Sequence, residues 1–189
     1  MTGSTVANVS SSPPHITVSA PFSAPACPPE TGALTVMCGG ELDTFATVEP
    51  VIATYARAVT LLGPAGSGQL TKMVNQICIA GVVQGLAEGL DFGRRAGLDV
   101  GAVVDVISKG AAQSWQMENR AATMARDEFD FGFAVQWMRK DLAMCLEAGR
   151  SLGASLPLAA LVDQFYARIE ARGGNRWDTS SLIHLLRNP

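Results

Sequence analysis

Two patterns of hydrophobic and polar positions divide the chain near residue 66. Before this point, short apolar runs alternate with turns rich in glycine and proline, which is typical of strands joined by loops. After it, apolar residues recur every three or four positions over long stretches, as they do in amphipathic helices. We therefore predict a mainly α protein, in which a partial α/β segment over residues 15–65 precedes an all-α domain over residues 66–189. Residues 1–14 are rich in Ser, Thr and Pro and are predicted to form a disordered tail.

The α/β segment is predicted to contain three short strands. They are expected at His15–Ser19, Gly32–Met37 and Val59–Leu62, with a loop over Ala20–Glu30 between the first two. A helix that starts near Asp43 separates the second and third strands. The apolar face of this helix is predicted to comprise Phe45, Val48, Val51, Ile52 and Tyr55. This segment is too small for a whole sheet and has the pattern of the end of one.

The all-α domain is predicted to begin with a long helix from Ser67 to about Ala96, which Gly97 ends. Asp99 and Ser114 are the expected N-caps of the two helices that follow. The later helices are predicted at Val100–Ser108, Ser114–Ala125, Phe133–Leu152, Leu158–Ala171 and Ser180–Arg187.

Glycines recur every fourth residue in the long helix, at positions 81, 85, 89, 93 and 97. An interior glycine destabilises a helix by about 0.5–1 kcal/mol relative to alanine. The regular interval therefore indicates that another helix, or a partner subunit, approaches the backbone closely. We expect a homo-oligomer that forms through the helical domain.

Composition and charge exclude several classes of partner. The hydrophobic content of 48% and the mean hydropathy of +0.20 suffice for a packed core. The net charge of −3 and the scattered basic residues provide no basic patch for nucleic acid. Polar residues such as Lys72, Asn75 and Glu88 interrupt the long helix, so we interpret it as a buried helix and not as a membrane span.

The four cysteines and two histidines are widely spaced, so no metal site is expected. Reduced thiols are the default for cysteines in this pattern, which indicates a cytoplasmic protein. The first ten residues lack the charged and apolar regions of a signal peptide, which agrees with that expectation.

The segment with the most informative chemistry is the glycine-rich turn that opens the long helix. Gly63, Gly66 and Gly68 are followed by Lys72 and Asn75. The glycines permit positive φ and close backbone approach at a helix start, where free N–H groups favour an anion. A spacing of three places Lys72 and Asn75 on one helical face, within reach of the same small ligand. The segment thus predicts a site for an anionic substrate.

Two better-known glycine motifs do not fit this turn. A P-loop requires Lys-Ser/Thr directly after its last glycine, whereas Gln69 and Leu70 follow Gly68 here. A dinucleotide fingerprint requires G-x-G-x-x-G, and Thr71 stands where its last glycine should fall. A strand-to-helix turn whose lysine is a solvated surface charge stays open as an alternative.

Three segments, in their order along the chain, resemble the 3-hydroxyisobutyrate dehydrogenase family of β-hydroxyacid dehydrogenases. The resemblance runs from about Ser19 to the C-terminus. The family's substrate-binding segment, D-A-P-V-S-G-G, corresponds to Ser19–Ser23. Its catalytic segment, G-x-x-G-x-G-x-x-x-K-x-x-N-N, matches the turn with Lys72 and Asn75. Its cofactor-binding segment, K-D-L-G-x-A-x-D, corresponds to 140–147.

The resemblance implies a Rossmann-type sheet followed by a helical domain of the 6-phosphogluconate-dehydrogenase C-terminal type. It further implies hydride transfer between NAD or NADP and a small 3-hydroxy acid, with Lys72 as general acid/base. The other implied site residues are Ser23, Asn75 and Gln76 for the substrate, and Lys140 and Gly66 for the cofactor.

The chain also departs from the family pattern. This sequence contains no counterpart of the family's N-terminal nucleotide-binding fingerprint. Ser19 replaces an acidic residue, Ala24-Pro25 replaces a glycine pair, Gln76 replaces the second asparagine, and Ala143 replaces a glycine. We therefore expect a dehydrogenase that lacks most of its nucleotide-binding domain and by itself binds NAD(P)H weakly. The alternative left open is a non-catalytic helical module for dimerisation or partner binding.

Overall fold

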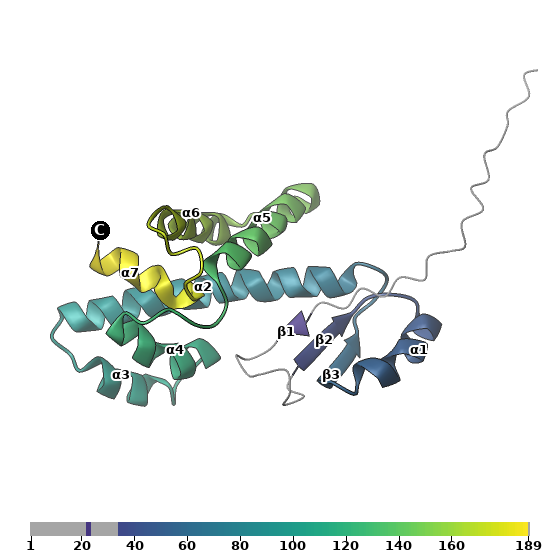
Figure 1. Cartoon of the computed structure of the whole chain (residues 1–189), viewed down its shortest axis with the longest axis horizontal. Coiled ribbons are helices and arrows are strands. Elements are labelled where there is room, and N and C mark those ends of the chain that lie inside the picture. The colour runs from purple at the N-terminus through teal and green to yellow at the C-terminus, as the bar shows by residue number, and fades with distance from the viewer. Residues whose placement is uncertain (1–21, 24–33, 189) are drawn as a thin grey trace, which may run out of the picture. The chain divides into compact units, whose positions relative to one another are not determined.

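The computed structural model describes residues 22–23 and 34–188 (Figure 1). They belong to two compact units, which divide between Gln69 and Leu70. The first unit contains the strands and one helix, and the second contains the remaining helices. The predicted tail 1–14 and the predicted strand His15–Ser19 lie outside the described residues.

The first unit contains a three-stranded sheet in the order β1-β2-β3. Strand β2 (Leu34–Cys38) pairs in parallel with β3 (Ala56–Leu61), and helix α1 (Leu42–Ile52) is the crossover that a parallel pair requires. These three elements confirm the predicted strand-helix-strand pattern. Strand β1 (Phe22–Ser23) pairs antiparallel with β2, so the loop predicted over Ala20–Glu30 is wrong at these two residues. The prolines near Phe22 and Ser23 led to the prediction of a loop, because proline occurs in loops and in edge strands alike.

Helix α1 packs on the sheet through fewer residues than predicted. Phe45 and Ile52 are buried against β2, and Val48 is partly buried beside them. Val51 and Tyr55 are exposed, which contradicts the predicted face. Val51 lies about 120° around the helix from Phe45, and Tyr55 follows the end of α1. A spacing of i, i+3, i+7 therefore describes the buried face.

The glycine-rich turn after β3 is held by backbone contacts to the end of β2. Gly40 N donates to Gly63 O at 2.9 Å. A Cβ on Gly39 would lie 2.7 Å from Pro64 O, so only glycine fits there. Gly63 and Gly66 have φ of 141° and 97°, which confirms the predicted positive φ in this turn. The turn thereby directs the chain into the long helix α2.

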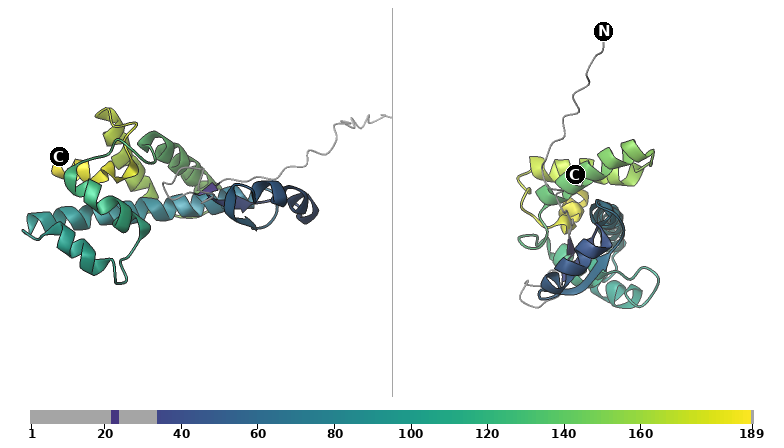
Figure 2. Two further views of the ribbon diagram at one scale, coloured as in Figure 1. Left: turned by 60° about the horizontal axis from the view of Figure 1, so that its bottom comes forward. Right: turned by 90° about the vertical axis from the view of Figure 1, so that its right-hand side faces the viewer.

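The second unit consists of helices (Figure 2). Their bounds agree with the predicted bounds to within about two residues. They are α2 (Ser67–Arg95), α3 (Val100–Ile107), α4 (Trp115–Arg126), α5 (Val135–Leu152), α6 (Pro157–Ala171) and α7 (Leu182–Arg187). The first three residues of α2 belong to the first unit, and the helix belongs to the second unit from Leu70 on. The last helix differs from prediction, because a 3₁₀ turn over Thr179–Ser181 precedes it. Asp178 tightens this turn by accepting hydrogen bonds from the backbone N–H and the hydroxyl of Ser180.

The predicted helix caps are present. The Asp99 side chain accepts from the N–H groups of Gly101 and Ala102, and the Ser114 hydroxyl accepts from Met117 N. Gly97 ends α2 with φ of 76°. These local signals define where the helices begin and end.

The core of the second unit surrounds one face of α2. Ala80, Val83, Ala87 and Leu90 are buried there, in a cluster with residues of α4, α5, α6 and α7. Among the described residues, α2 has the length and composition that could cross a membrane, and 39% of its apolar window is buried inside the protein. Its inner face is therefore a core face of a folded unit.

Helices α5 and α6 are joined by ion pairs as well as by apolar packing. Arg139 on α5 pairs with Asp163 at 3.1 Å and also with Glu170, both on α6. These carboxylates raise the pKa of Arg139 above its usual range. Because Arg139 directly precedes the Lys140-Asp141 segment, the pairs also fix the part of α5 that presents it.

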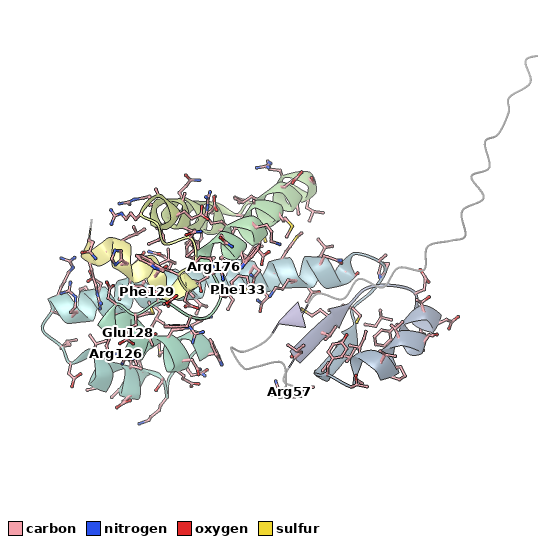
Figure 3. The ribbon with its side chains drawn as sticks, viewed as in Figure 1. Arg57, Arg126, Glu128, Phe129, Phe133 and Arg176 are labelled. Carbon is pink, nitrogen blue, oxygen red and sulfur yellow. The ribbon has the colours of Figure 1, made fainter. Side chains whose placement is uncertain are left out.

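The segment between α4 and α5 is fastened by Asp178. It begins beside the exposed Arg126–Glu128 ion pair and carries Phe129 and Phe133 (Figure 3). Asp178 N donates to Phe129 O at 2.8 Å, and Phe133 N donates to Asp178 Oδ2 at 3.0 Å. The buried Asp178 carboxylate thus orders the entry to α5.

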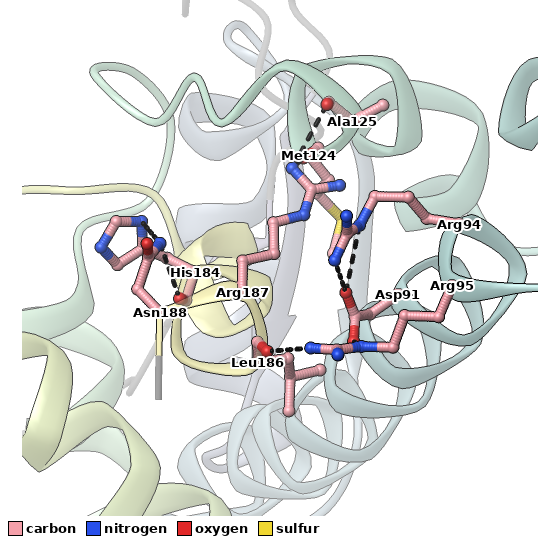
Figure 4. A network of polar contacts seen from close by, with 9 residues as sticks. All are labelled: Asp91, Arg94, Arg95, Met124, Ala125, His184, Leu186, Arg187 and Asn188. Atoms are coloured by element: carbon pink, nitrogen blue, oxygen red, sulfur yellow. Dashed lines mark hydrogen bonds and ion pairs between the residues drawn. The ribbon is translucent and has the colours of Figure 1, made fainter. Parts of the chain in front are cut away.

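The C-terminal helix α7 is held against α2 and α4 by arginines (Figure 4). Arg187 Nη1 donates to Met124 O at 2.8 Å and to Ala125 O at 3.2 Å, carbonyls in the last turn of α4. Arg95 on α2 donates to Leu186 O at 2.8 Å. These bonds satisfy carbonyls that a helix end leaves without intrahelical partners.

Candidate active site

Two helices of the second unit bring the predicted residues together. Lys72, Asn75 and Gln76 lie in the first turns of α2, at helical positions i, i+3 and i+4. Lys140 and Asp141 lie on α5. Gln76 Nε2 donates to Asp141 Oδ2 at 2.7 Å, across 65 residues of sequence. The contact joins the family's catalytic and cofactor-binding segments in one place.

A continuous set of polar contacts runs from α2 to α5. Asn75 Nδ2 donates to Gln76 Oε1 at 2.9 Å, and Gln76 then donates to Asp141. The other carboxylate oxygen of Asp141 is 2.9 Å from Lys140 Nζ. The Lys140 side chain is 57% exposed, whereas that of Asp141 is 13% exposed. The polar contacts therefore lead from a buried amide to an exposed ammonium.

Lys72 is half-buried on the same helix, about one turn before Gln76. Burial lowers the pKa of its ammonium, because a low-dielectric environment disfavours charge. The Asp141 carboxylate opposes this by raising the pKa, and the Lys140 ammonium lowers it further. A fully solvated lysine would keep its ordinary pKa. The surroundings of Lys72 are therefore not those of a fully solvated surface lysine.

Three residues of α5 that the sequence did not single out belong to this site, although Asp141 lies in the segment that resembles the family's cofactor-binding one. Asp141 bonds Gln76, Met138 Sδ accepts from Gln76 Nε2 at 3.5 Å, and Cys145 Sγ donates to Met73 O at 3.6 Å. Burial, and then the Asp141 charge, raise the pKa of the Cys145 thiol. Met138, Asp141 and Cys145 are spaced i, i+3, i+7, so helical periodicity was the signal that could have grouped them.

Ser23 and Gly66 belong to the first unit. The backbone of Ser23 pairs with Thr35, and its predicted substrate contact stays a prediction. At Gly66, no atom of the described residues lies within 4 Å of the position that a Cβ would occupy. A ligand can therefore approach this backbone, which directly precedes the N-terminus of α2, where N–H groups favour an anion.

In the part of the chain that the structure describes, no three His, Cys, Asp or Glu side chains are grouped so that they could hold a metal ion.

Residues 66–186 match the family model described as NAD-binding of NADP-dependent 3-hydroxyisobutyrate dehydrogenase. The chain belongs to this family, as its motifs predicted, and the fold confirms the predicted fold class. The cofactor of the family is NAD or NADP.

Curated relatives and solved structures agree with this membership. An uncharacterised oxidoreductase of Shewanella frigidimarina is 64% identical over 164 residues, which cover 87% of this chain and 56% of the relative. The 2-hydroxy-3-oxopropionate reductase of Escherichia coli is 32% identical over 82% of this chain and 53% of its own length. The chain thus spans about half the length of these relatives.

A solved structure gives the same picture of the fold. The Mycobacterium tuberculosis 3-hydroxyisobutyrate dehydrogenase, solved with L-serine, superposes with a TM-score of 0.79 at 29% identity. The match covers 90% of this chain and 60% of that structure. The matched part therefore has the fold of a family member.

Proposed function

We propose that this chain supplies the acid/base and substrate-binding part of an NAD(P)-dependent dehydrogenase that acts on a small 3-hydroxy acid. The observation that supports this most is the half-buried Lys72, whose pKa is lowered by burial and which lies within the electrostatic influence of Asp141 and Lys140. An amine in such a place is uncharged more often than a solvated lysine, and a general base must be uncharged to accept a proton.

Oxidation of an alcohol requires the loss of a proton from oxygen and a hydride from carbon. Lys72 Nζ takes the hydroxyl proton, which leaves the electron pair on oxygen to form the carbonyl. The nicotinamide, when bound, supplies the hydride acceptor. Positioned proton transfer of this kind contributes about 10²–10⁴-fold to a rate. In the reverse direction, the Lys72 ammonium returns the proton to the carbonyl oxygen.

The remaining residues bind and orient. The Asn75 amide, on the same face of α2 as Lys72, orients the substrate oxygen. Ser23 binds the substrate carboxylate, and Lys140 lies at the nicotinamide end of the site. Gly66 allows the cofactor to approach the backbone. The assignment of Lys72, Asn75, Ser23 and Lys140 to these roles is supported by the family match and by the contacts between α2 and α5.

The test is a chimera, because the chain spans about half the length of its relatives. The N-terminal segment of the 64% identical Shewanella frigidimarina relative that precedes the matched region is fused to this chain. We expect NAD(P)H formation with a 3-hydroxy acid from a panel that also contains 2-hydroxy acids and simple alcohols. The Lys72→Ala chimera should lose at least about 10²-fold in kcat/KM.

The matched control is Lys109→Ala, which removes an exposed lysine in the same unit. It should leave kcat/KM unchanged. Wild-type activity in the Lys72→Ala chimera, with folding verified by circular dichroism, would rule out the assigned role. A folded chimera that binds NAD(P)H but oxidises no hydroxy acid would count against the proposed substrate class.

We infer as a second function that the helical unit forms homo-oligomers, and one observation favours it. Within the described part of the chain, Gly81 is approached by Leu158, but apart from the flanking residues and the helix's own backbone no atom lies within 4 Å of a Cβ placed on Gly85 or Gly89. Val74 and Phe92 are exposed on the same face of α2. A helix of a second copy is the partner that would use this open glycine surface. This function would persist if the chain were a non-catalytic module.

A further inference from the structure

Gln76 is the most buried polar side chain of the candidate site, with an exposed fraction of 4%. Its amide is engaged at both ends. Oε1 accepts from Asn75, while Nε2 donates to Asp141 Oδ2 and to Met138 Sδ. A primary amide has two N–H groups, so both donors of Gln76 are used within the protein. The side chain has little surface and no donor left for a substrate.

Asp141, which receives the Gln76 bond, is restrained unequally at its two oxygens. Oδ2 is bound by the buried Gln76, whose position in α2 is fixed. Oδ1 is bound by the Lys140 ammonium, at the end of a flexible and largely exposed side chain. A surface ion pair of this kind contributes little to holding a geometry. The amide of Gln76 is therefore the contact that keeps the carboxylate at the inner end of the site.

The position of Asp141 matters because several ionisable groups surround it. The ammonium of Lys72 on α2 and that of Lys140 on α5 lie within its electrostatic influence, as does the thiol of Cys145, one turn further along α5. Asp141 is the group that offsets the effect of burial on Lys72. A carboxylate that moved toward solvent with Lys140 would interact with Lys72 less, because charge interactions weaken with distance and with hydration.

We propose that Gln76 is a positioning residue, which holds the Asp141 carboxylate beside Lys72 and makes no contact with the substrate. This inference rests on the proposed function of Lys72 as the acid/base group. It reassigns Gln76 from the substrate-binding role that the sequence predicted, and it leaves Asn75 as the amide of this pair that faces the ligand. It also gives a physical meaning to the replacement of asparagine by glutamine at this position, because an asparagine is shorter by one methylene, about 1.5 Å.

A direct measurement of the pKa of Lys72, in the complete chain without substrate or cofactor, tests this positioning role. The chain contains three lysines, Lys72, Lys109 and Lys140, so a protein labelled with ¹³C at lysine Cε gives three resolvable titrations by NMR. Arginine substitutions at Lys72 and Lys109 assign the signals. The exposed Lys109 serves as an internal reference in each sample.

The variants are Gln76→Leu, Gln76→Asn, Asp141→Asn and the double variant Gln76→Leu/Asp141→Asn. Asp141→Asn should lower the pKa of Lys72, because the opposing negative charge is lost. Gln76→Leu and Gln76→Asn should shift it in the same direction by a smaller amount. In the Asp141→Asn background, Gln76→Leu should have no further effect, since Gln76 acts through Asp141.

Gln84→Leu is the matched control. Gln84 lies on the same helix, is 5% exposed and donates to a carboxylate, that of Glu88, at 2.7 Å. Its loss should leave the Lys72 titration unchanged. If Gln76→Leu or Gln76→Asn does not change the pKa of Lys72, raises it, or changes it equally with and without Asp141, the positioning role is wrong.

Kinetics in the chimera separate this inference from the proposed function. A positioning role predicts that Gln76→Asn changes kcat and its pH dependence with little change in KM. A substrate contact predicts a change in KM with an unchanged pH profile, and that result would overturn the inference. A chimera with no dehydrogenase activity, together with the expected Lys72 titrations, would reject the proposed function and leave the Gln76–Asp141–Lys72 coupling demonstrated.

Discussion

Lys72 is subject to two opposing influences. Burial favours the uncharged amine, whereas the Asp141 carboxylate favours the ammonium. An acid/base group that works in both directions benefits from such a balance, because both protonation states must be accessible. The balance also implies a cost in stability, since the ammonium is half-buried at neutral pH. Two predictions follow from this conflict at the level of the single residue.

The first prediction concerns the pH dependence of catalysis. Oxidation requires uncharged Lys72, so kcat/KM of the chimera should rise with pH, with an inflection below the ordinary lysine value of 10.5. Reduction requires the Lys72 ammonium, so kcat/KM for the reduction should fall with pH over the same range. Asp141→Asn should move the inflection to lower pH, because the carboxylate raises the pKa of Lys72. An inflection that Asp141→Asn leaves in place would contradict the assignment to Lys72.

The second prediction concerns stability. The folded-state pKa of Lys72 lies below its unfolded value, so the unfolded chain binds more protons between the two values and stability rises with pH there. The destabilisation by Lys72 is fully present below the pKa that Lys72 has in the folded chain, and it disappears above about pH 10.5. Lys72→Met should therefore increase the free energy of unfolding at pH 7 by about 0.5 kcal/mol, a value reduced for partial solvation. Urea titrations of both proteins at pH 7 and pH 11 measure this change in the free energy of unfolding. An equal increase at both pH values would show that the titration of Lys72 is not its cause.

At the level of elements, the helices of the second unit follow from local signals. Asp99 and Ser114 cap the predicted helix starts, and Gly97 ends α2 with positive φ. These features depend on residues within one turn of each other, so the sequence contains them completely. Strand β1 has two residues, too few for a period to register, and the 3₁₀ turn before α7 depends on the side chain of Asp178.

The candidate site was predictable only in part, for the same reason. Lys72 and Asn75 share a helical face, and their spacing alone indicated a common ligand. The bond from Gln76 to Asp141 spans 65 residues and depends on how α2 packs against α5. No local sequence pattern predicts a contact between two residues so far apart along the chain. The sequence therefore placed Asp141 only within a cofactor-binding segment, without a role of its own. It gave Gln76 a substrate-binding role that its buried contacts do not favour.

The N-cap of α4 provides a prediction at this scale. The Ser114 hydroxyl accepts a hydrogen bond from Met117 N at 3.1 Å, which satisfies one of the four free N–H groups of the helix start. Ser114→Ala should lower the free energy of unfolding by about 1 kcal/mol, whereas Ser114→Asp should retain it. Urea denaturation with fixed m-value measures both. An equal decrease in the free energy of unfolding in the two variants would show that the Ser114 hydroxyl does not stabilise the protein by capping α4.

At the scale of the whole molecule, α2 has two apolar faces. The inner face belongs to the core of the second unit. The outer face carries Val74 and Phe92, which are 61% and 73% exposed, around the open glycines Gly85 and Gly89. Glycines in a helix interior destabilise it by about 0.5–1 kcal/mol each relative to alanine. Within the described residues this loss has no compensating contact, and a second copy packed on the outer face would supply one.

Gly85→Leu tests this inference by distinguishing the free chain from the associated one. A Cβ at this position meets no neighbouring atom within 4 Å in the single chain, and the substitution removes a helix-destabilising glycine, so the folded monomer should become more stable. The leucine side chain would separate two helices that meet at Gly85, so self-association should weaken. Sedimentation equilibrium should show wild type as a dimer or larger and Gly85→Leu as a monomer. Ala102→Leu, which adds a leucine to an exposed position on α3, should stay associated. A monomeric wild type, or a Gly85→Leu variant that associates as wild type does, would show that this face is not the interface.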